Sequence, residues 1–224
     1  MQEESQQSIF TQEIALSSEE AANLAEELKE KLKEEGKPEA DINLIRKLIS
    51  GLGDQRGLLR RTFSEGLGII GEAALPGLRE ALLNSQSVTV RRAAAKTLKL
   101  VGDPSALPDL LHALLNDQDP VVQGSAAGAI AIFGEDASKN LIEVLESPNS
   151  SEMQCGLASW GLSFIGAKGA KVLTRGAISN NEKVRASSIA ALGEQIQLLS
   201  DAEAKDILIN AINDPSDEVQ VEAI

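Results

Sequence analysis

The chain has 224 residues and a formal net charge of −13, with 42% hydrophobic and only 2% aromatic residues. A single Cys excludes an internal disulfide and a cysteine-based zinc site, and a single His argues against an imidazole-rich metal site. The negative charge argues against nucleic acid as a partner, because its phosphates would be repelled. No apolar run approaches the roughly 18 residues of a membrane span. The acidic, polar start lacks the pattern of a signal peptide, so we expect a cytoplasmic protein without membrane insertion.

The N-terminal part is polar and acidic. Residues 1–40 hold eleven Glu and four Lys, a balance of −7. Residues 1–16 are predicted to form a disordered tail. Ser17 and Glu20 make the S-x-x-E pattern of a capping box, which predicts a charged helix over 17–36. This helix is expected to cap a repeat array that follows the break at Gly36-Lys37-Pro38 and spans 39–224.

The array repeats a unit of two helices. Gly71, Gly102, Gly134 and Gly166 stand 31, 32 and 32 residues apart. Each closes a segment whose apolar residues recur at helical spacing, and a second short helix follows, as over Ala106–Leu115. The first helix of the first unit is predicted over Ile42–Leu52, and the last unit is incomplete at Ile224. Such self-similarity is the signature of a repeat architecture.

Local signals agree with this interpretation. Glycine suits the left-handed position that ends a helix, and Pro76 and Pro108 suit a first helical turn, which has no hydrogen bond to lose. The loops 116–120 and 213–217 offer caps for the next helix. One helical pair cannot bury its apolar face alone, so the pairs must stack. We therefore predict an all-α fold, an α-α superhelix (solenoid) of HEAT-like repeats with about five to six helical pairs.

The only Trp is the first candidate for a binding residue. On the helix that contains it, Trp160 lies roughly 130° from the centre of the apolar face, so it is expected to point away from the core. We interpret it as the anchor of a partner-binding groove lined by small residues: Gly124, Gly128, Ala131, Gly156, Ser159 and Ser163. The alternative is that these small residues let helices approach closely and that Trp160 fills a gap between repeats.

A basic row is the second candidate. Residues 54–100 carry eight Arg or Lys against four Asp or Glu, a balance of +4. Arg61, Arg92, Lys96 and Lys99 form a row on the helices that end at Gly71 and Gly102. They are interpreted as an electrostatic contact for an acidic partner or for the propionate groups of a ligand. A solvated face is the alternative.

Other charged and polar residues are interpreted as structural. Arg60, Arg91 and Arg185 occupy a different register and are expected to pair with loop acids of neighbouring repeats. Cys155 is expected to be a partly buried, inert thiol, and His112 to be solvated. No catalytic or metal-binding constellation is predicted.

Several segments resemble one family of HEAT-like proteins, those of the phycobilisome. They are Gly51–Arg60 with Phe63-Ser64-Glu65, Val90–Leu98, Leu114–Asp117, Gly124–Ala129 and Trp160–Gly166. Within this family the chain is most similar to the NblB-type degradation proteins, which act in bleaching of cyanobacteria under nutrient starvation. The E/F-type bilin lyase subunits are more distant relatives. The match covers residues from about 40 to 195.

The resemblance implies phycobiliprotein subunits as partners and a phycobilin carried transiently by the partner, with no tightly bound cofactor. Two functions remain open. The first is a binding protein that helps phycobilisome disassembly or bilin release under nutrient stress. The second is a bilin lyase subunit that attaches or detaches a phycobilin at a phycobiliprotein cysteine. A generic protein–protein interaction scaffold is a further alternative.

Overall fold

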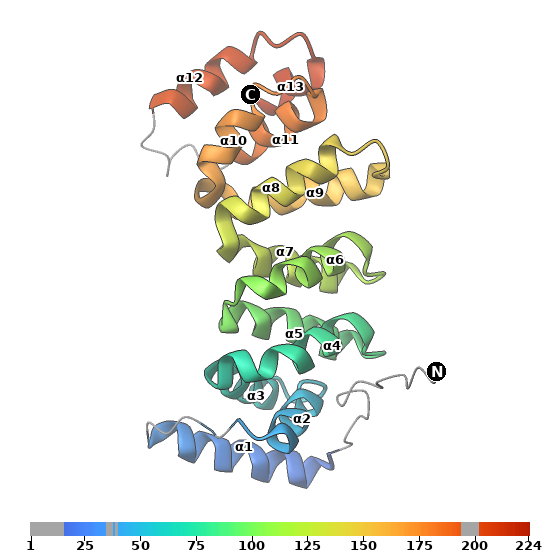
Figure 1. Ribbon diagram of the computed structural model, residues 1–224, viewed down its shortest axis with the longest axis vertical. Coiled ribbons are helices and arrows are strands. Elements are labelled where there is room, and N and C mark those ends of the chain that lie inside the picture. Colours follow the sequence, from blue (N-terminus) through green and yellow to red (C-terminus); the bar gives the residue numbers. More distant parts are fainter. Residues whose placement is uncertain (1–15, 35–37, 39, 194–201) are drawn as a thin grey trace, which may run out of the picture. The chain divides into compact units, whose positions relative to one another are not determined.

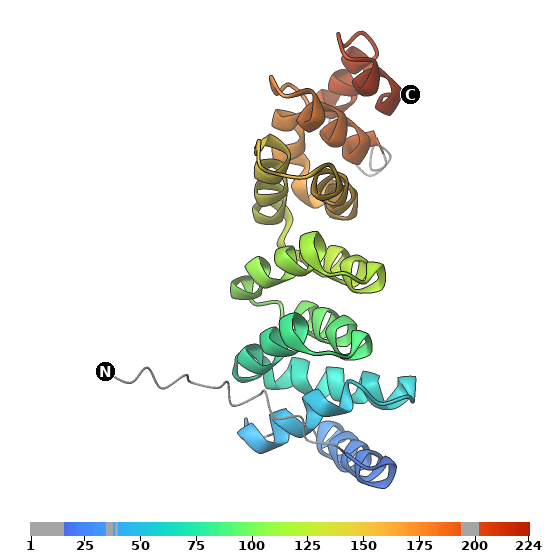
Figure 2. The same cartoon turned by 90° about the vertical axis from the view of Figure 1, so that its right-hand side faces the viewer.

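A computed structural model describes residues 16–34, 38, 40–193 and 202–224. Every helix or strand assigned within these ranges is a helix, which confirms the predicted all-α class. Apart from Leu16, the tail predicted over 1–16 lies outside the described residues, as do Gly36 and Lys37 of the predicted break. Figures 1 and 2 show helices that follow one another in pairs along the chain.

The chain forms two compact units, the first made of residues 1–113 and 119–126 and the second of 114–118 and 127–224. The first unit holds α1 (Ser18–Lys33), α2 (Ile42–Gly51), α3 (Gly57–Ile70), α4 (Leu75–Asn84), α5 (Val88–Val101) and most of α6 (Leu107–Asn116). The second holds α8 (Gly134–Glu146), α9 (Glu152–Ile165), α10 (Ala170–Gly176), α11 (Glu182–Gly193), α12 (Ala202–Ala211) and α13 (Asp217–Glu222). Helix α7 (Pro120–Ile130) contributes residues to both units.

Within each unit the helices pack as repeat pairs. Helix α2 packs against α3, α4 against α5, α8 against α9 and α10 against α11. The second helix of each pair also packs against the second helix of the next: α3 against α5, and α9 against α11. We call α2, α4, α6, α8, α10 and α12 the A helices, and α3, α5, α7, α9, α11 and α13 the B helices.

The helix ends explain the repeat register. Gly71, Gly102 and Gly134 have φ values of 74°, 71° and 49°, in the left-handed region that glycine adopts without steric cost. Short 3-10 helices, Gly71–Ala74, Pro104–Ala106, Ala131–Phe133 and Gly166–Gly169, lead from each B helix to the next A helix. The turn glycines thus set the point at which the chain changes direction.

Predicted caps are mostly present. In the capping box, the Ser17 backbone N–H donates to Glu20 Oε2 at 2.8 Å, and the Glu20 N–H donates to Ser17 Oγ at 3.2 Å. Asp119 accepts from the backbone N–H of Val121 at 2.8 Å and so caps α7. The cap predicted for the 213–217 loop is absent, because Ser216, the N-cap residue of α13, makes no side-chain hydrogen bond to that helix. Asp214 instead accepts from the Ser216 N–H at 2.9 Å.

Leucines and alanines supply most of the core, and close approaches between helices depend on glycine. A Cβ added at Gly66 of α3 would lie 2.6 Å from Leu28 Cδ2 of α1, and one added at Gly161 of α9 would lie 2.9 Å from Leu141 Cδ1 of α8. Polar bonds also join neighbouring B helices. Thr97 bonds to Ser64 at 3.0 Å, and Ser159 to Ser187 at 2.6 Å.

A second repeated feature is an arginine that closes the loop before a B helix, seen at α3, α5 and α11. Arg60, Arg91 and Arg185 each donate from Nη1 to the carbonyl oxygen six residues earlier, at Asp54, Ser85 and Ser179. The prediction that they pair with acids of neighbouring repeats is confirmed for Arg185. For Arg60 it is wrong, because its guanidinium bonds to the Asp54 and Gln55 carbonyls instead.

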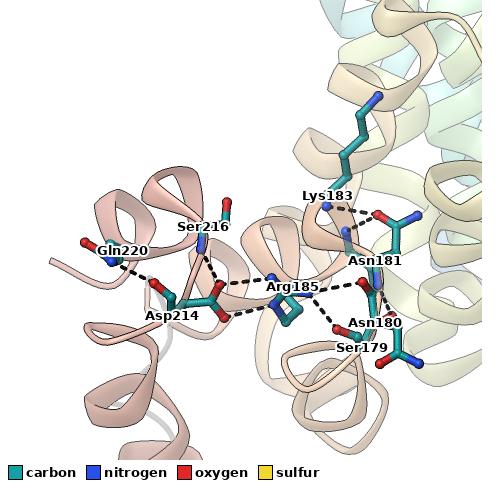
Figure 3. Close-up of polar contacts among 9 residues, drawn as sticks. Ser179, Asn180, Asn181, Lys183, Arg185, Asp214, Ser216 and Gln220 are labelled. Atoms are coloured by element: carbon teal, nitrogen blue, oxygen red, sulfur yellow. Dashed lines mark hydrogen bonds and ion pairs between the residues drawn. The ribbon is translucent and has the colours of Figure 1, made fainter.

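Figure 3 shows the polar contacts around Arg185. Its Nε and Nη2 atoms both bond to the Asp214 carboxylate at 2.9 Å, and the two side chains are only 14% and 12% exposed. Gln220 Nε2 donates to the Asp214 carbonyl at 2.6 Å. The bonds from Arg185 are the main reason that the pKa of Asp214 lies below its usual range. A bidentate pair of this kind fixes geometry as well as charge.

This network predicts a pH-dependent contribution to stability. Because the folded-state pKa of Asp214 is lowered, its contribution is present above the unfolded pKa, near 3.9, and is lost as the pH falls towards the folded value. Urea unfolding at pH 6 should show Asp214→Asn less stable than wild type by about 1–3 kcal/mol. The difference should shrink below about pH 4. A difference that stays constant down to pH 2.5 would contradict this account.

Candidate functional site

The exposed side of α9 carries an aromatic pair. Ala158, Gly161 and Leu162 face the core, whereas Trp160 is 40% exposed, in agreement with its predicted orientation. Phe164, one turn later, is 45% exposed. The two rings meet edge to face, with centroids 5.2 Å apart and an interplanar angle of 87°. Sequence reasoning did not select Phe164, although it stands two residues before the predicted turn glycine, as do Ile69, Leu100 and Ile132 in their repeats.

Two glycines of the predicted groove have no packing role. A Cβ added at Gly128 of α7 or at Gly156 of α9 would meet no atom within 4 Å. The alternative that these residues let helices approach closely therefore does not hold for Gly128 and Gly156. Gly161, which is not part of the predicted groove, differs, because an added Cβ there would lie within 3.0 Å of both Leu141 and Leu114. A helical glycine without a packing reason costs stability, so bare backbone at these two positions calls for another explanation.

The other predicted groove residues are half-buried or belong to the first unit. Ser159 belongs to the contact between α9 and α11, because its hydroxyl bonds to the buried Ser187 and to the Cys155 carbonyl. Ser163 is half-buried and donates to the Trp160 carbonyl at 2.8 Å. Ala131 is half-buried in the 3-10 turn, and Gly124 belongs to the first unit, so it is described apart from Trp160. We call Gly156, Trp160 and Phe164 of α9 the aromatic face.

The eight cations of residues 54–100 are of two kinds: those with a carboxylate or carbonyl partner, and those with none among the described residues. Arg56 pairs with Asp54 at 2.7 Å, Arg61 with Glu65 at 2.8 Å, and Arg79 of α4 with Asp109 of α6. Arg60 and Arg91 bond to loop carbonyls. Within the described ranges, Arg92, Lys96 and Lys99 form no ion pair or hydrogen bond through their side chains. We call these three residues the α5 row.

Within the α5 row, partial desolvation and neighbouring positive charge disfavour the protonated form of Lys96. The members of the row stand at positions i, i+4 and i+7 of one helix, so they share one face. Partial desolvation lowers the pKa of Lys96, and the positive charges of Arg92 and Arg60 lower it further. Arg61, predicted to belong to the same contact, differs from the other three because Glu65 neutralises it. The row is thus a set of like charges that an anion would stabilise.

The remaining predicted residues suggest no further site. Cys155 is buried, as expected, and His112 lies on an exposed side of α6. In the part of the chain that the structure describes, no group of His, Cys, Asp or Glu could hold a metal ion. Over the same residues, no helix is long and apolar enough to cross a membrane.

Comparison with known proteins identifies the class. A family model for HEAT repeats matches residues 45–131 and 75–158, so the protein is a HEAT-repeat protein. The chain is 50% identical over 208 residues to the bilin biosynthesis protein MpeU of Synechococcus sp. (strain WH8020), a match that covers 93% of this chain and 70% of the relative. It therefore belongs to the family of HEAT-like phycobilisome proteins to which the sequence motifs pointed.

A solved structure is also similar, at a lower level. It is the complex of CpcE and CpcF of phycocyanin lyase from Nostoc sp. PCC7120, with 18% identity, 82% of this chain and 97% of that chain covered, and a TM-score of 0.42. Similarity of this size carries no functional argument, so the family assignment depends on the sequence relatives.

Alanine substitution distinguishes the glycines with open space around them from a closely packed glycine. Gly128→Ala and Gly156→Ala should each raise the free energy of unfolding by up to about 1 kcal/mol, because alanine favours the helix and the space is open. The matched control Gly161→Ala should lower it by about 1–3 kcal/mol, since the new methyl group would clash with Leu141 and Leu114. Thermal and urea unfolding would measure both effects. Equal destabilisation by all three substitutions would show that Gly128 and Gly156 are packing residues.

Proposed function

We propose that this chain is a bilin lyase subunit, which helps to join a linear tetrapyrrole to a cysteine of a phycobiliprotein subunit. The observation that carries the proposal is the 50% identity, over 93% of the chain, with a protein of bilin biosynthesis. Of the two functions that the sequence left open, this relative favours bilin attachment over phycobilisome disassembly.

The proposed reaction requires that the cysteine thiol and the bilin be positioned against each other, and it needs no redox chemistry. A cysteine thiol adds across a carbon–carbon double bond of the bilin: one C–S bond forms, and the thiol proton moves to a bilin carbon. Atoms and electrons balance without an oxidant or reductant. Holding the two reactants in a reactive orientation can by itself supply a large part of the rate enhancement. A HEAT-repeat protein with exposed B-helix faces is suited to that task, since repeat arrays use such surfaces to bind partners.

The aromatic face supports the docking part of this proposal. Trp160 and Phe164 expose apolar rings beside bare backbone at Gly156, and aromatic anchors of this kind supply much of the affinity of protein interfaces. Maintaining exposed rings and unpacked glycines has a cost in stability. We infer that a phycobiliprotein subunit covers the aromatic face when the two proteins meet.

Substitution of Trp160 tests the docking surface. Trp160→Ala should weaken binding of an apo-phycobiliprotein subunit at least about tenfold, the loss typical of an interface anchor. It should lower the free energy of unfolding by only about 1 kcal/mol, since the exposed ring forms a single aromatic pair. Ile209→Ala, at an exposed apolar residue of the A helix α12, is the matched control. A stability loss of about 3–5 kcal/mol would instead show that Trp160 belongs to the core.

Bilin transfer tests the function itself. The chain, alone and with a second HEAT-repeat subunit, would be incubated with bilin and separate apo-α and apo-β phycobiliprotein subunits. Covalent product would be followed on denaturing gels by zinc-enhanced bilin fluorescence. We expect labelling of one subunit at least about tenfold faster than the spontaneous reaction, a small part of the acceleration that enzymes achieve.

The reverse experiment separates the two functions. The chain would be incubated with an assembled, chromophore-bearing phycobiliprotein and followed by absorbance and size-exclusion chromatography. The assembled protein should not dissociate on the time scale of the labelling reaction. If labelling is no faster than the spontaneous reaction while the assembled protein dissociates, bilin attachment is wrong and disassembly is correct.

A further inference from the structure

The α5 row stands out against the charge of the whole chain. The protein carries a net charge of −13, yet Arg92, Lys96 and Lys99 have no acidic partner among the described residues. Glu65, which stands on α3 at the position aligned with Lys96, is engaged by Arg61. Five of the eight cations in residues 54–100 have a carboxylate or carbonyl partner, and among the described residues the three of the α5 row have none.

The geometry of the row fits two carboxylates. Residues four apart on a helix have Cβ atoms about 5–6 Å apart on one face. Arg92 and Lys96 therefore present two cations side by side, and Lys99 extends the same face by one turn. An arginine fork binds a carboxylate through two hydrogen bonds, and a lysine binds it as a point charge.

An apolar strip continues this face. Leu100, four residues after Lys96, is 55% exposed, and Ile69 of α3 is exposed as well. The two helices are in close contact here, since a Cβ added at Gly68 would lie 3.1 Å from Leu100 Cβ. Cations followed by exposed aliphatic side chains match an amphipathic ligand that carries carboxylates on an apolar, conjugated body.

We propose that the α5 row binds the two propionate groups of a linear tetrapyrrole, with Leu100 and Ile69 against its rings. This inference deepens the proposed function and rests on it, because it names the part of the bilin that the chain recognises. The two propionates of a bilin sit on its adjacent central rings, a spacing suited to cations one helical turn apart. Bound carboxylates would also relieve the repulsion that Arg92 and Arg60 exert on Lys96.

An esterified ligand gives a sharp test. Biliverdin and biliverdin dimethyl ester share the conjugated system but differ in the two propionate charges. The full chain should bind biliverdin at least tenfold more tightly than the ester, measured by absorbance titration. Arg92→Gln with Lys96→Gln should remove this preference without lowering the melting temperature. The control is Lys139→Gln with Lys171→Gln, which removes the same charge from two A helices and should keep the preference.

Two outcomes would overturn the inference, and the labelling assay separates its failure from that of the proposed function. Equal binding of the acid and the ester, or no binding of biliverdin, would show that the row does not hold propionates. If the double variant instead weakens binding of an apo-phycobiliprotein subunit while its bilin binding is unchanged, the row docks an acidic protein surface. Faster labelling of a phycobiliprotein in any of these cases would leave the proposed function standing. Tight, acid-selective bilin binding without labelling would leave this site standing and the proposed function wrong.

Discussion

Each helical pair of this protein buries its apolar side chains only by stacking on the next pair. With few aromatic residues available, leucines and alanines fill the space between helices, and glycines such as Gly66 and Gly161 allow the closest approaches. The loops before α3, α5, α11 and α13 are closed by side-chain bonds to carbonyl oxygens, from Arg60 in the first unit to Gln220 in the second. Packing therefore determines one side of every B helix and leaves the opposite side free to differ between repeats.

That free side carries the candidate functions. On α5 it bears Arg92, Lys96 and Lys99, and on α9 it bears Trp160 and Phe164. Neither set contributes much to the core, and both carry a cost: repulsion among unpaired cations in one case, and exposed rings beside unpacked glycine in the other. Such costs are typical of binding surfaces, where a partner supplies the missing contacts.

The sequence predicted the helices and the repeat register well. Each turn between repeats that needs a positive φ, as at Gly102, requires a glycine, so glycines recur at the repeat spacing. The sequence could not separate Gly128 from Gly161, since a helical wheel shows which side a residue occupies but not what lies opposite. For the same reason it placed Ser159 in a groove rather than against Ser187. Phe164 was missed although its register was visible, because helical periodicity does not show that its ring meets Trp160 edge to face.

Hydrogen exchange tests most directly the central claim that the B-helix faces bind the bilin and its acceptor protein. Exchange would be followed by mass spectrometry for the chain alone and with an apo-phycobiliprotein subunit and bilin. The account predicts slower exchange in peptides from α5 (88–101) and α9 (152–165), with α4 (75–84) and α8 (134–146) unchanged. Protection confined to the A helices α4 and α8 would contradict it.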